Sequence, residues 1–230
     1  MKRLRAGILA ATGTVGQRLI QLLANHPWFD IAVVAASDNS AGKPYAQATR
    51  WLLETPIPAS VANMTVQACK PGLDCDFVLS GLPSGIAEET ELELARSGMP
   101  VISNASSHRM KADVPLLIPE INPDHLDAVA AQKPRMGGKG FIVTNPNCTT
   151  IGLVFPMAAL HRTFGLDAVS VVTMQAISGA GYPGVASLDI LDNVLPAIDA
   201  GGEDQKVETE PLKLLGSWTN NAFVDAPIRM

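Results

Sequence analysis

Short apolar segments alternate with helix-forming segments along the first 144 residues, and this alternation restricts the possible folds more than any other feature. Several of these segments are apolar throughout, as strands are when both faces of a parallel sheet are buried. Alternation of this kind is typical of a doubly wound parallel sheet, so we predict an α/β, Rossmann-like fold. The predicted strands are residues 5–10, 31–36, 76–80, 100–103 and 141–144, and the predicted helices are residues 17–25 and 86–97.

The pattern changes after Asn147. A helix is expected over residues 150–164, followed by a long β-branched strand over residues 168–177, AVSVVTMQAI, and then by the glycine-rich stretch SGAGYPG. We therefore predict two domains with their boundary near Asn147. Residues 1–147 would form a dinucleotide-binding domain and residues 148–230 an α+β domain.

The composition disfavours several classes of function. The net charge is −5 and the pI is about 5.3, without a basic cluster, so we expect neither nucleic acid nor an anionic membrane as a partner. No apolar stretch approaches the roughly 20 residues of a membrane span. The cysteines, at positions 69, 75 and 148, are odd in number and lack metal-ligand spacing. We predict a reduced, cytoplasmic protein without a metal site.

A glycine-containing turn, ATGTVG, follows the first predicted strand. Gly7 lies in the strand, and Gly13 and Gly16 lie in the turn and at the start of the helix. Residues without a Cβ let the backbone approach a pyrophosphate, and a helix N-terminus supplies free N–H groups and positive potential. Ala11 stands where a middle glycine could be, so a tight turn without a ligand is the alternative. The surrounding strand order favours the dinucleotide.

The second predicted strand ends in AASDNSAGK, where the cofactor type would be selected. An NAD enzyme usually carries an acidic residue at this tip, which binds the ribose hydroxyls. Here Ser37 comes first, with Ser40 and Lys43 nearby, and hydroxyls with a cation suit a 2′-phosphate. NADP is therefore favoured, although Asp38 counts against it. An ordinary polar loop is the alternative for each of these residues.

Cys148 lies in TNPNCTT, between a proline-containing turn and an apolar run. At a helix N-terminus a thiolate is stabilised by the helix dipole and by free N–H groups. A lone cysteine is more often a small buried residue. A cysteine at a domain junction, downstream of a dinucleotide fold, favours a nucleophile instead.

Eight stretches follow one another in order along nearly the whole chain: AATGTVGQRL, SDNSAGKPY, VISNASSHRM, PLLIPEIN, IVTNPNCTT, QAISGAGYPG, LDILDNVLP and GGEDQKVETEPLKLLG. Together they resemble the aspartate-β-semialdehyde dehydrogenases, in their archaeal and fungal-like branch. The resemblance implies an NADP-dependent oxidoreductase that interconverts L-aspartyl 4-phosphate and L-aspartate 4-semialdehyde, with release or uptake of phosphate, in lysine, threonine, methionine and isoleucine biosynthesis. It also implies a homodimer or homotetramer, formed through a catalytic and dimerisation domain that is incomplete here.

The resemblance also assigns roles to individual residues. Cys148 would be the nucleophile, because a thiolate serves both to attack and to leave in a reaction that passes through a thioester. Asn147 would orient the carbonyl, Gln175 would contact the substrate and Glu203 would bind its amino group. Arg109 and Lys206 would hold the phosphate or carboxylate. The cofactor-binding residues would be Thr12, Gly13, Thr14, Val15, Gly16, Ser37, Ser40, Ser84, Gly179 and Gly181.

A proton-transferring base is not found at the position that the resemblance implies. Cysteine catalysis of this kind usually needs a histidine, which in the family follows the GG-E-x-x-K segment and an arginine that binds the substrate carboxylate. This chain ends at Met230 before either position. The histidines present, none of which matches, are His26, His108, His125 and His161.

Three hypotheses follow for the chain. It could be an aspartate-semialdehyde dehydrogenase, a malonyl-CoA reductase-like enzyme that also uses a cysteine thioester, or a catalytically inactive NADP-binding fragment. Asn147, Glu203 and Lys206 favour the aspartyl-phosphate substrate over malonyl-CoA. The absent base favours the inactive fragment. The sequence leaves open whether the chain is a genuine truncated product.

Overall fold

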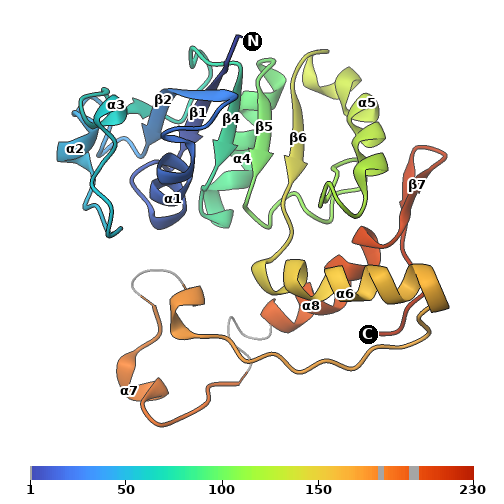
Figure 1. The fold of residues 1–230 in the computed structure, drawn as a ribbon. Coiled ribbons are helices and arrows are strands. Elements are labelled where there is room, and N and C mark those ends of the chain that lie inside the picture. Colours follow the sequence, from blue (N-terminus) through green and yellow to red (C-terminus); the bar gives the residue numbers. More distant parts are fainter. Residues whose placement is uncertain (1, 181–183, 197–201) are drawn as a thin grey trace. The chain divides into compact units, whose positions relative to one another are not determined.

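The computed structural model describes residues 2–180, 184–196 and 202–230 of the chain. It contains two compact units (Figure 1). Unit 1 comprises Met1–Pro115 and Leu126–Asn145, and unit 2 comprises Leu116–His125 and Pro146–Met230. No helix in the described ranges is long and apolar enough to cross a membrane.

Unit 1 is built on a six-stranded sheet in which every neighbouring pair of strands is parallel. The strand order is β3-β2-β1-β4-β5-β6, so the chain moves outward from β1 on one side and then returns to fill the other side. The predicted doubly wound parallel sheet is confirmed. The strands are β1 (Leu4–Leu9), β2 (Phe29–Ala36), β3 (Gln67–Ala68), β4 (Phe77–Ser80), β5 (Pro100–Ser103) and β6 (Phe141–Thr144).

Helices cover both faces of this sheet, and side chains that alternate along each strand pack on opposite faces. In β2, Val33 packs in one apolar cluster with Leu94 of α4, whereas Val34 packs in a second cluster with Ile20 of α1. All four side chains are at least 99% buried. The helical elements of unit 1 and its border are α1 (Thr14–Leu23), α2 (Tyr45–Ala48), α3 (Ala59–Ala62), α4 (Ser84–Arg96), η1 (Pro123–Asp127), α5 (Ala128–Gln132) and η2 (Lys133–Met136).

Unit 2 is organised by two helices that pack against each other (Figure 1). Val154 and Ala158 of α6 share an apolar cluster with Leu214 of α8 and with Leu116, which comes from the segment before η1. A short antiparallel hairpin follows α8. The elements of unit 2 are α6 (Cys148–Phe164), η3 (Ile177–Ala180), α7 (Ser187–Ile190), α8 (Gly202–Leu214), β7 (Ser217–Thr219) and β8 (Ala222–Val224).

The strand predicted over residues 168–177 is wrong. Only Ala168 makes a bridge, to Arg229, and the segment then continues without a strand partner in the described part of the chain until η3 begins at Ile177. A strand needs a neighbour for its backbone N–H and C=O groups. Val172 and Met174 are 89% and 91% exposed. The segment therefore has the β-branched composition of a strand, but it lacks a neighbouring strand in the described part of the chain.

Helix starts also differ from the prediction by two or three residues. Helices α1, α4 and α6 begin at Thr14, Ser84 and Cys148, each earlier than expected. The reason is that the residues before them, Gly13, Pro83 and Asn147, serve as N-caps. The domain boundary at Asn147 stays a prediction.

Candidate active site

The turn between β1 and α1 leaves the first backbone amides of α1 without a side-chain cap. Ala10 has a positive φ of 55°, which is uncommon for a residue with a side chain, and its carbonyl accepts the Gly13 N–H at 3.0 Å. Gly13 caps the helix with its backbone alone. Uncapped amides at a helix N-terminus are the ordinary receptor for a phosphate group, so this turn fits a dinucleotide pyrophosphate.

Two glycines let the turn pack closely against its surroundings. A Cβ on Gly16 would lie 2.2 Å from the Ala10 carbonyl oxygen, so α1 can approach β1 only because that Cβ is absent. A Cβ on Gly81, in the loop after β4, would lie 3.0 Å from a methyl of Val15. Since β1 and β4 are neighbours where the strand order reverses, this is the position at which open α/β sheets bind ligands.

Two buried polar side chains donate hydrogen bonds to backbone carbonyls of the same turn. The hydroxyl of Tyr45 donates to the Ala11 carbonyl at 2.8 Å, and Gln17 Nε2 donates to the Thr12 carbonyl at 2.9 Å. Burial raises the pKa of Tyr45 to about 12, so its hydroxyl keeps its proton at neutral pH. The turn is therefore fixed in place by hydrogen bonds from α1 and α2.

The predicted 2′-phosphate residues lie at the carboxyl end of β2. Ser37 is exposed, and its carbonyl accepts the Ser40 N–H at 2.8 Å in a turn. Lys43 donates to the Asn39 carbonyl at 2.8 Å. Asp38, which favoured NAD, forms an exposed ion pair with Lys70 at 3.8 Å. The arrangement places hydroxyls and a cation at the tip of β2, as a 2′-phosphate would require.

The loops after β4 and β5 are joined by hydrogen bonds. Ser84, at the start of α4, contacts the hydroxyl of Ser106 at 2.9 Å. Arg109 is only 7% exposed, and its guanidinium donates to the Asn104 carbonyl at 2.8 Å. Asn145, after β6, donates to the side chain of Asn104. These bonds hold Arg109 in unit 1 at the carboxyl edge of the sheet.

A buried carboxylate lies beneath these two loops. Glu91 of α4 is fully buried, and its Oε1 accepts the hydroxyls of Ser80 at 2.6 Å and Ser103 at 2.7 Å. Its Oε2 lies 3.6 Å from Nε2 of His108, and neither atom has a hydrogen-bond partner in the described part of the chain. Burial raises the pKa of Glu91 and lowers that of His108, so both favour their neutral forms. Glu91 therefore holds a proton more readily than an exposed glutamate would, and His108 holds one less readily than an exposed histidine would.

Cys148 is the first residue of α6, in agreement with the predicted position of the thiol at a helix start. Its side chain is exposed and forms no disulfide. The side chain of Asn147 accepts the N–H groups of Thr149 at 2.9 Å and Thr150 at 3.3 Å, which caps the helix. The cap thereby fixes the backbone on both sides of the thiol, at the positive end of α6.

Three further polar side chains, those of Gln175, Glu203 and Lys206, form a hydrogen-bonded group at this helix start. Asn147 Nδ2 donates to Glu203 Oε2 at 2.8 Å, and Lys206 donates to Glu203 Oε1 at 2.6 Å. Gln175 Nε2 donates to the Thr149 hydroxyl at 2.7 Å. Burial acts to raise the pKa of Glu203, but the hydrogen bonds from Lys206 and Asn147 outweigh it and hold that pKa below its usual value. Glu203 is therefore an anion at neutral pH.

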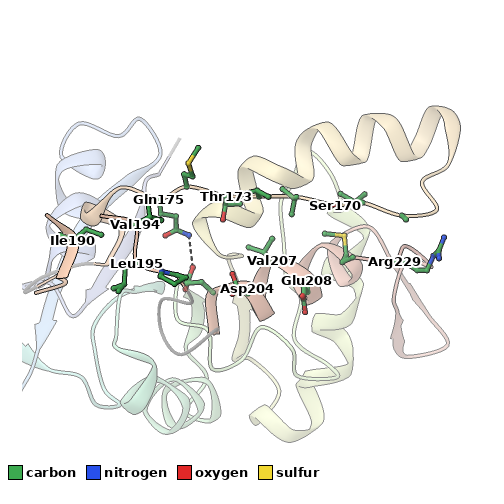
Figure 2. Close-up of a pocket in the computed structure, with 18 of the residues that line it drawn as sticks. Ser170, Thr173, Gln175, Ile190, Val194, Leu195, Asp204, Val207, Glu208 and Arg229 are labelled. Carbon is green, nitrogen blue, oxygen red and sulfur yellow. Dashed lines mark hydrogen bonds between the residues drawn. The ribbon is translucent and has the colours of Figure 1, made fainter. Parts of the chain in front are cut away.

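A pocket of about 940 Å³ in unit 2 adjoins these residues (Figure 2). One side is residues 168–175, and another is formed by Glu203, Asp204 and Val207 of α8. The dashed line in Figure 2 marks the 3.5 Å hydrogen bond from Gln175 to Glu203. The pocket wall thus includes the Glu203 carboxylate and the Gln175 amide, which are hydrogen-bonded to Asn147 and Thr149 at the start of α6.

Of the residues predicted for the site, unit 2 brings together Asn147, Cys148, Gln175, Glu203 and Lys206. Gly179 lies in η3, where an added Cβ would be 3.4 Å from Gln175 Oε1. Gly181 lies outside the described residues. Unit 1 holds the remaining predicted residues, which are Thr12, Gly13, Thr14, Val15, Gly16, Ser37, Ser40, Ser84 and Arg109.

Two family models match the chain. The model for the semialdehyde dehydrogenase NAD binding domain matches residues 5–129, and the model for the semialdehyde dehydrogenase dimerisation domain matches residues 157–223. The chain belongs to the semialdehyde dehydrogenase family. The family resemblance expected from the motifs is confirmed.

Named members of the family are similar along almost the whole chain. An aspartate-semialdehyde dehydrogenase from Archaeoglobus fulgidus is 49% identical over 99% of this chain, and one from Cryptococcus neoformans is 48% identical over 96%. The crystal structure of aspartate semialdehyde dehydrogenase with NADP from Candida albicans is 41% identical, with a TM-score of 0.88 over 99% of this chain. The chain spans 66%, 62% and 66% of the lengths of these three proteins.

The motifs of the semialdehyde dehydrogenase family did not reveal every residue that builds the site. Thr149 links Gln175 to the helix start, and Glu210 of α8 accepts the backbone N–H of Asn147 at 2.6 Å. Glu210 could have been found from its spacing, because it lies seven residues after Glu203 and two helical turns bring both to one face. No pattern in the sequence pairs Glu91 with Ser80 and Ser103.

Proposed function

We propose that this chain acts as an NADP-dependent aspartate-semialdehyde dehydrogenase, which interconverts L-aspartyl 4-phosphate and L-aspartate 4-semialdehyde through a thioester on Cys148. The observation that carries the proposal is the exposed thiol at the first position of α6, between Asn147 and the Gln175–Thr149 contact. The 49% sequence identity with an aspartate-semialdehyde dehydrogenase, over 99% of the chain, supports the aspartyl substrate over malonyl-CoA.

In the reducing direction, the Cys148 thiolate attacks the acyl carbon of the aspartyl phosphate. A carbon–sulfur bond forms, the carbon–oxygen bond to phosphate breaks, and phosphate leaves with the electron pair of that bond. Reduction of the thioester then releases the aldehyde and returns the thiolate. Its position at the start of α6 would hold the Cys148 sulfur in a fixed direction when the carbonyl arrives.

The charged residues predicted for the substrate, Glu203 and Lys206 of unit 2 and Arg109 of unit 1, are suited to an amino-acid substrate. Glu203 is an anion and would bind the substrate amino group, while Lys206 and Arg109 would hold the phosphate or the carboxylate. In the described structure the Glu203 carboxylate is occupied by Lys206 and Asn147, so an ammonium group would exchange with one of these partners. Gln175 and Asn147 would orient the carbonyl.

The cofactor would bind along the carboxyl edge of the sheet of unit 1. The uncapped amides at Thr14, Val15 and Gly16 suit the pyrophosphate, and Ser37 with Ser40 suits the 2′-phosphate. When bound, NADPH would supply the hydride that reduces the thioester, and NADP⁺ would accept the hydride in the reverse direction. Gly179 would leave room for the nicotinamide.

Replacement of the nucleophile tests the proposal. Cys148→Ala should lower NADP-dependent reduction of the acyl phosphate by about 10⁴-fold or more, because it removes the atom that carries the thioester. NADP affinity, measured by fluorescence titration, should be nearly unchanged, since the residues proposed to bind the pyrophosphate and the 2′-phosphate lie in unit 1. Full turnover by Cys148→Ala, or loss of both properties together, would count against the assigned role. Turnover of malonyl-CoA in place of the aspartyl substrate would support the alternative enzyme, and saturable binding without turnover by the unaltered protein would support the inactive fragment.

We further propose that the protein works in the cytoplasm as a homo-oligomer. The match of residues 157–223 to a dimerisation domain supports the assembly. The cysteines, none of which is paired in the described structure, suit a reducing compartment. Sedimentation velocity on the purified protein measures the oligomeric state, and a monomer at micromolar concentration would contradict the assembly.

A further inference from the structure

Two carboxylates of one helix hold the residue that precedes the reactive cysteine. Glu203 Oε2 accepts the side-chain amide of Asn147 at 2.8 Å, and Glu210 Oε2 accepts its backbone N–H at 2.6 Å. Glu203 and Glu210 are seven residues apart in α8, which places them on one face, two turns from each other. Every polar group on the side chain of Asn147 is therefore engaged, together with its N–H.

The contact with Glu210 completes an arrangement that a helix usually completes by itself. In a capping box, the side chain of the third helical residue, a Glu or Gln, reaches back to the N–H of the N-cap residue. In α6 the N-cap is Asn147 and the third helical residue is Thr150, whose side chain is too short for this role. Glu210 provides the missing carboxylate from a different helix, 63 residues further along the chain.

Glu210 is buried, so its contact with Asn147 is not that of an exposed surface charge. The residue is only 2% exposed, and a carboxylate in the interior is costly unless hydrogen bonds satisfy it. A hydrogen bond from a backbone N–H to a carboxylate is short and about twice as strong as a neutral one. The apolar contact of Val154 and Ala158 with Leu214 keeps α6 and α8 together, so the carboxylate is held on a packed scaffold.

We propose that Glu210 is a positioning residue for Cys148: its carboxylate fixes the backbone of Asn147, and through it the direction in which the thiol leaves the first turn of α6. The proposal rests on the proposed function, in which Cys148 is the nucleophile. Attack on a carbonyl requires a narrow geometry, and a displacement of about 1 Å can lower a rate about 100-fold. In this proposal Glu210 acts on the reaction through Asn147 and not by contact with the substrate.

A pair of variants separates positioning from general stabilisation. Glu210→Ala removes the acceptor, so amide exchange of the Asn147 N–H, measured by NMR, should quicken about tenfold. Its kcat should fall about 100-fold with little change in KM. Glu210→Gln keeps an acceptor oxygen and should recover most of both losses. Glu120→Gln is the matched control, because Glu120 is an exposed carboxylate of unit 2 outside the site, and it should behave as the unaltered protein.

The outcomes distinguish this inference from the proposed function. Absence of turnover in the unaltered protein would contradict the function, while the exchange rate would still decide whether Glu210 holds Asn147. Normal turnover in the unaltered protein with an unchanged kcat in Glu210→Ala would overturn the positioning role alone. If Glu210→Ala does not fold, Glu210→Gln decides. A change of Asn147 N–H protection and kcat in parallel supports the role, and an unprotected N–H with normal kcat in a folded protein overturns it.

Discussion

The two units build their candidate sites from different materials. In unit 1 the turn proposed for the cofactor consists of consecutive residues, Thr12 to Gly16, and the groups that it offers to a ligand are backbone amides. In unit 2 the site consists of side chains from positions 147, 175, 203 and 210, which are joined by hydrogen bonds across the fold. The first site therefore depends on the path of the main chain, and the second depends on the length and charge of particular side chains.

This difference predicts opposite sensitivities to substitution. In unit 1 an added methyl group should be most harmful where α1 packs closely against the end of β1. Changes of charge at the exposed carboxyl end of β2 should often be harmless. In unit 2 a change of a single atom, such as amide nitrogen to carboxylate oxygen, should matter more than a change of volume. Each of the following experiments tests one side of that contrast.

The largest effect on stability is expected at Gly16. Gly16→Ala places a Cβ 2.2 Å from the Ala10 carbonyl oxygen, so the helix must move away from β1 at a cost of about 3 kcal/mol. NADP binding should weaken with it, because the amides of α1 are displaced. Gly13→Ala is the matched control: its Cβ would lie 3.4 Å from the same oxygen and should cost less than about 1 kcal/mol. Urea unfolding compares the two, and equal losses would contradict the role of close packing.

A change of one atom should be enough to disable the site in unit 2. Asn147→Asp keeps the side-chain oxygen that caps α6, but it places a second carboxylate beside Glu203, where the amide now donates at 2.8 Å. We expect kcat to fall about 100-fold while the stability of α6 is kept. The loss should lessen at lower pH, when one of the two carboxylates takes a proton. Asn147→Ser, which caps without repulsion, should lose less activity, and the opposite ranking would contradict the repulsion.

The sequence was most informative where structure is local. Apolar runs at residues 100–103 and 141–144 became β5 and β6 with the predicted bounds, and Cys148 lies at a helix start as its neighbours indicated. The ATGTVG turn was also predictable, because its glycines act through backbone geometry. These features depend on residues that are adjacent in the chain, so a single stretch contains the whole signal.

Features that depend on distant partners were missed or predicted wrongly. Residues 168–177 have the composition of a strand, but composition does not supply a neighbouring strand. Glu91 and Glu210 look like solvated helix charges in the sequence, yet both are buried by partners from other elements. Their roles emerge only when the fold brings a hydroxyl or an N–H to the carboxylate.

The smallest expected effect is a pH dependence of stability that is due to Glu91. It tests whether a buried side chain in unit 1 is neutral, in contrast to the charged side chains of unit 2. Because the folded pKa of Glu91 is raised, mainly by burial, the native state holds a proton that the unfolded chain releases above its ordinary pKa of 4.5. The protein should therefore lose some stability as the pH rises from about 4.5 toward the folded pKa. Glu91→Gln does not titrate, keeps an acceptor for Ser80 and Ser103, and can donate to His108. Its stability relative to the unaltered protein should increase over that pH range.

Urea unfolding at several pH values between 4 and 8 measures this difference. His108 also titrates there, and its surroundings include Glu88, Lys111 and Arg135, so His108→Gln is measured in parallel to separate its contribution. A pH-independent difference between Glu91→Gln and the unaltered protein would mean that Glu91 stays ionised in the fold. The loops after β4 and β5 would then be held by a buried carboxylate, as Asn147 is held by Glu203 and Glu210 in unit 2. Unit 1 would then depend on a charged side chain at this position, as unit 2 does.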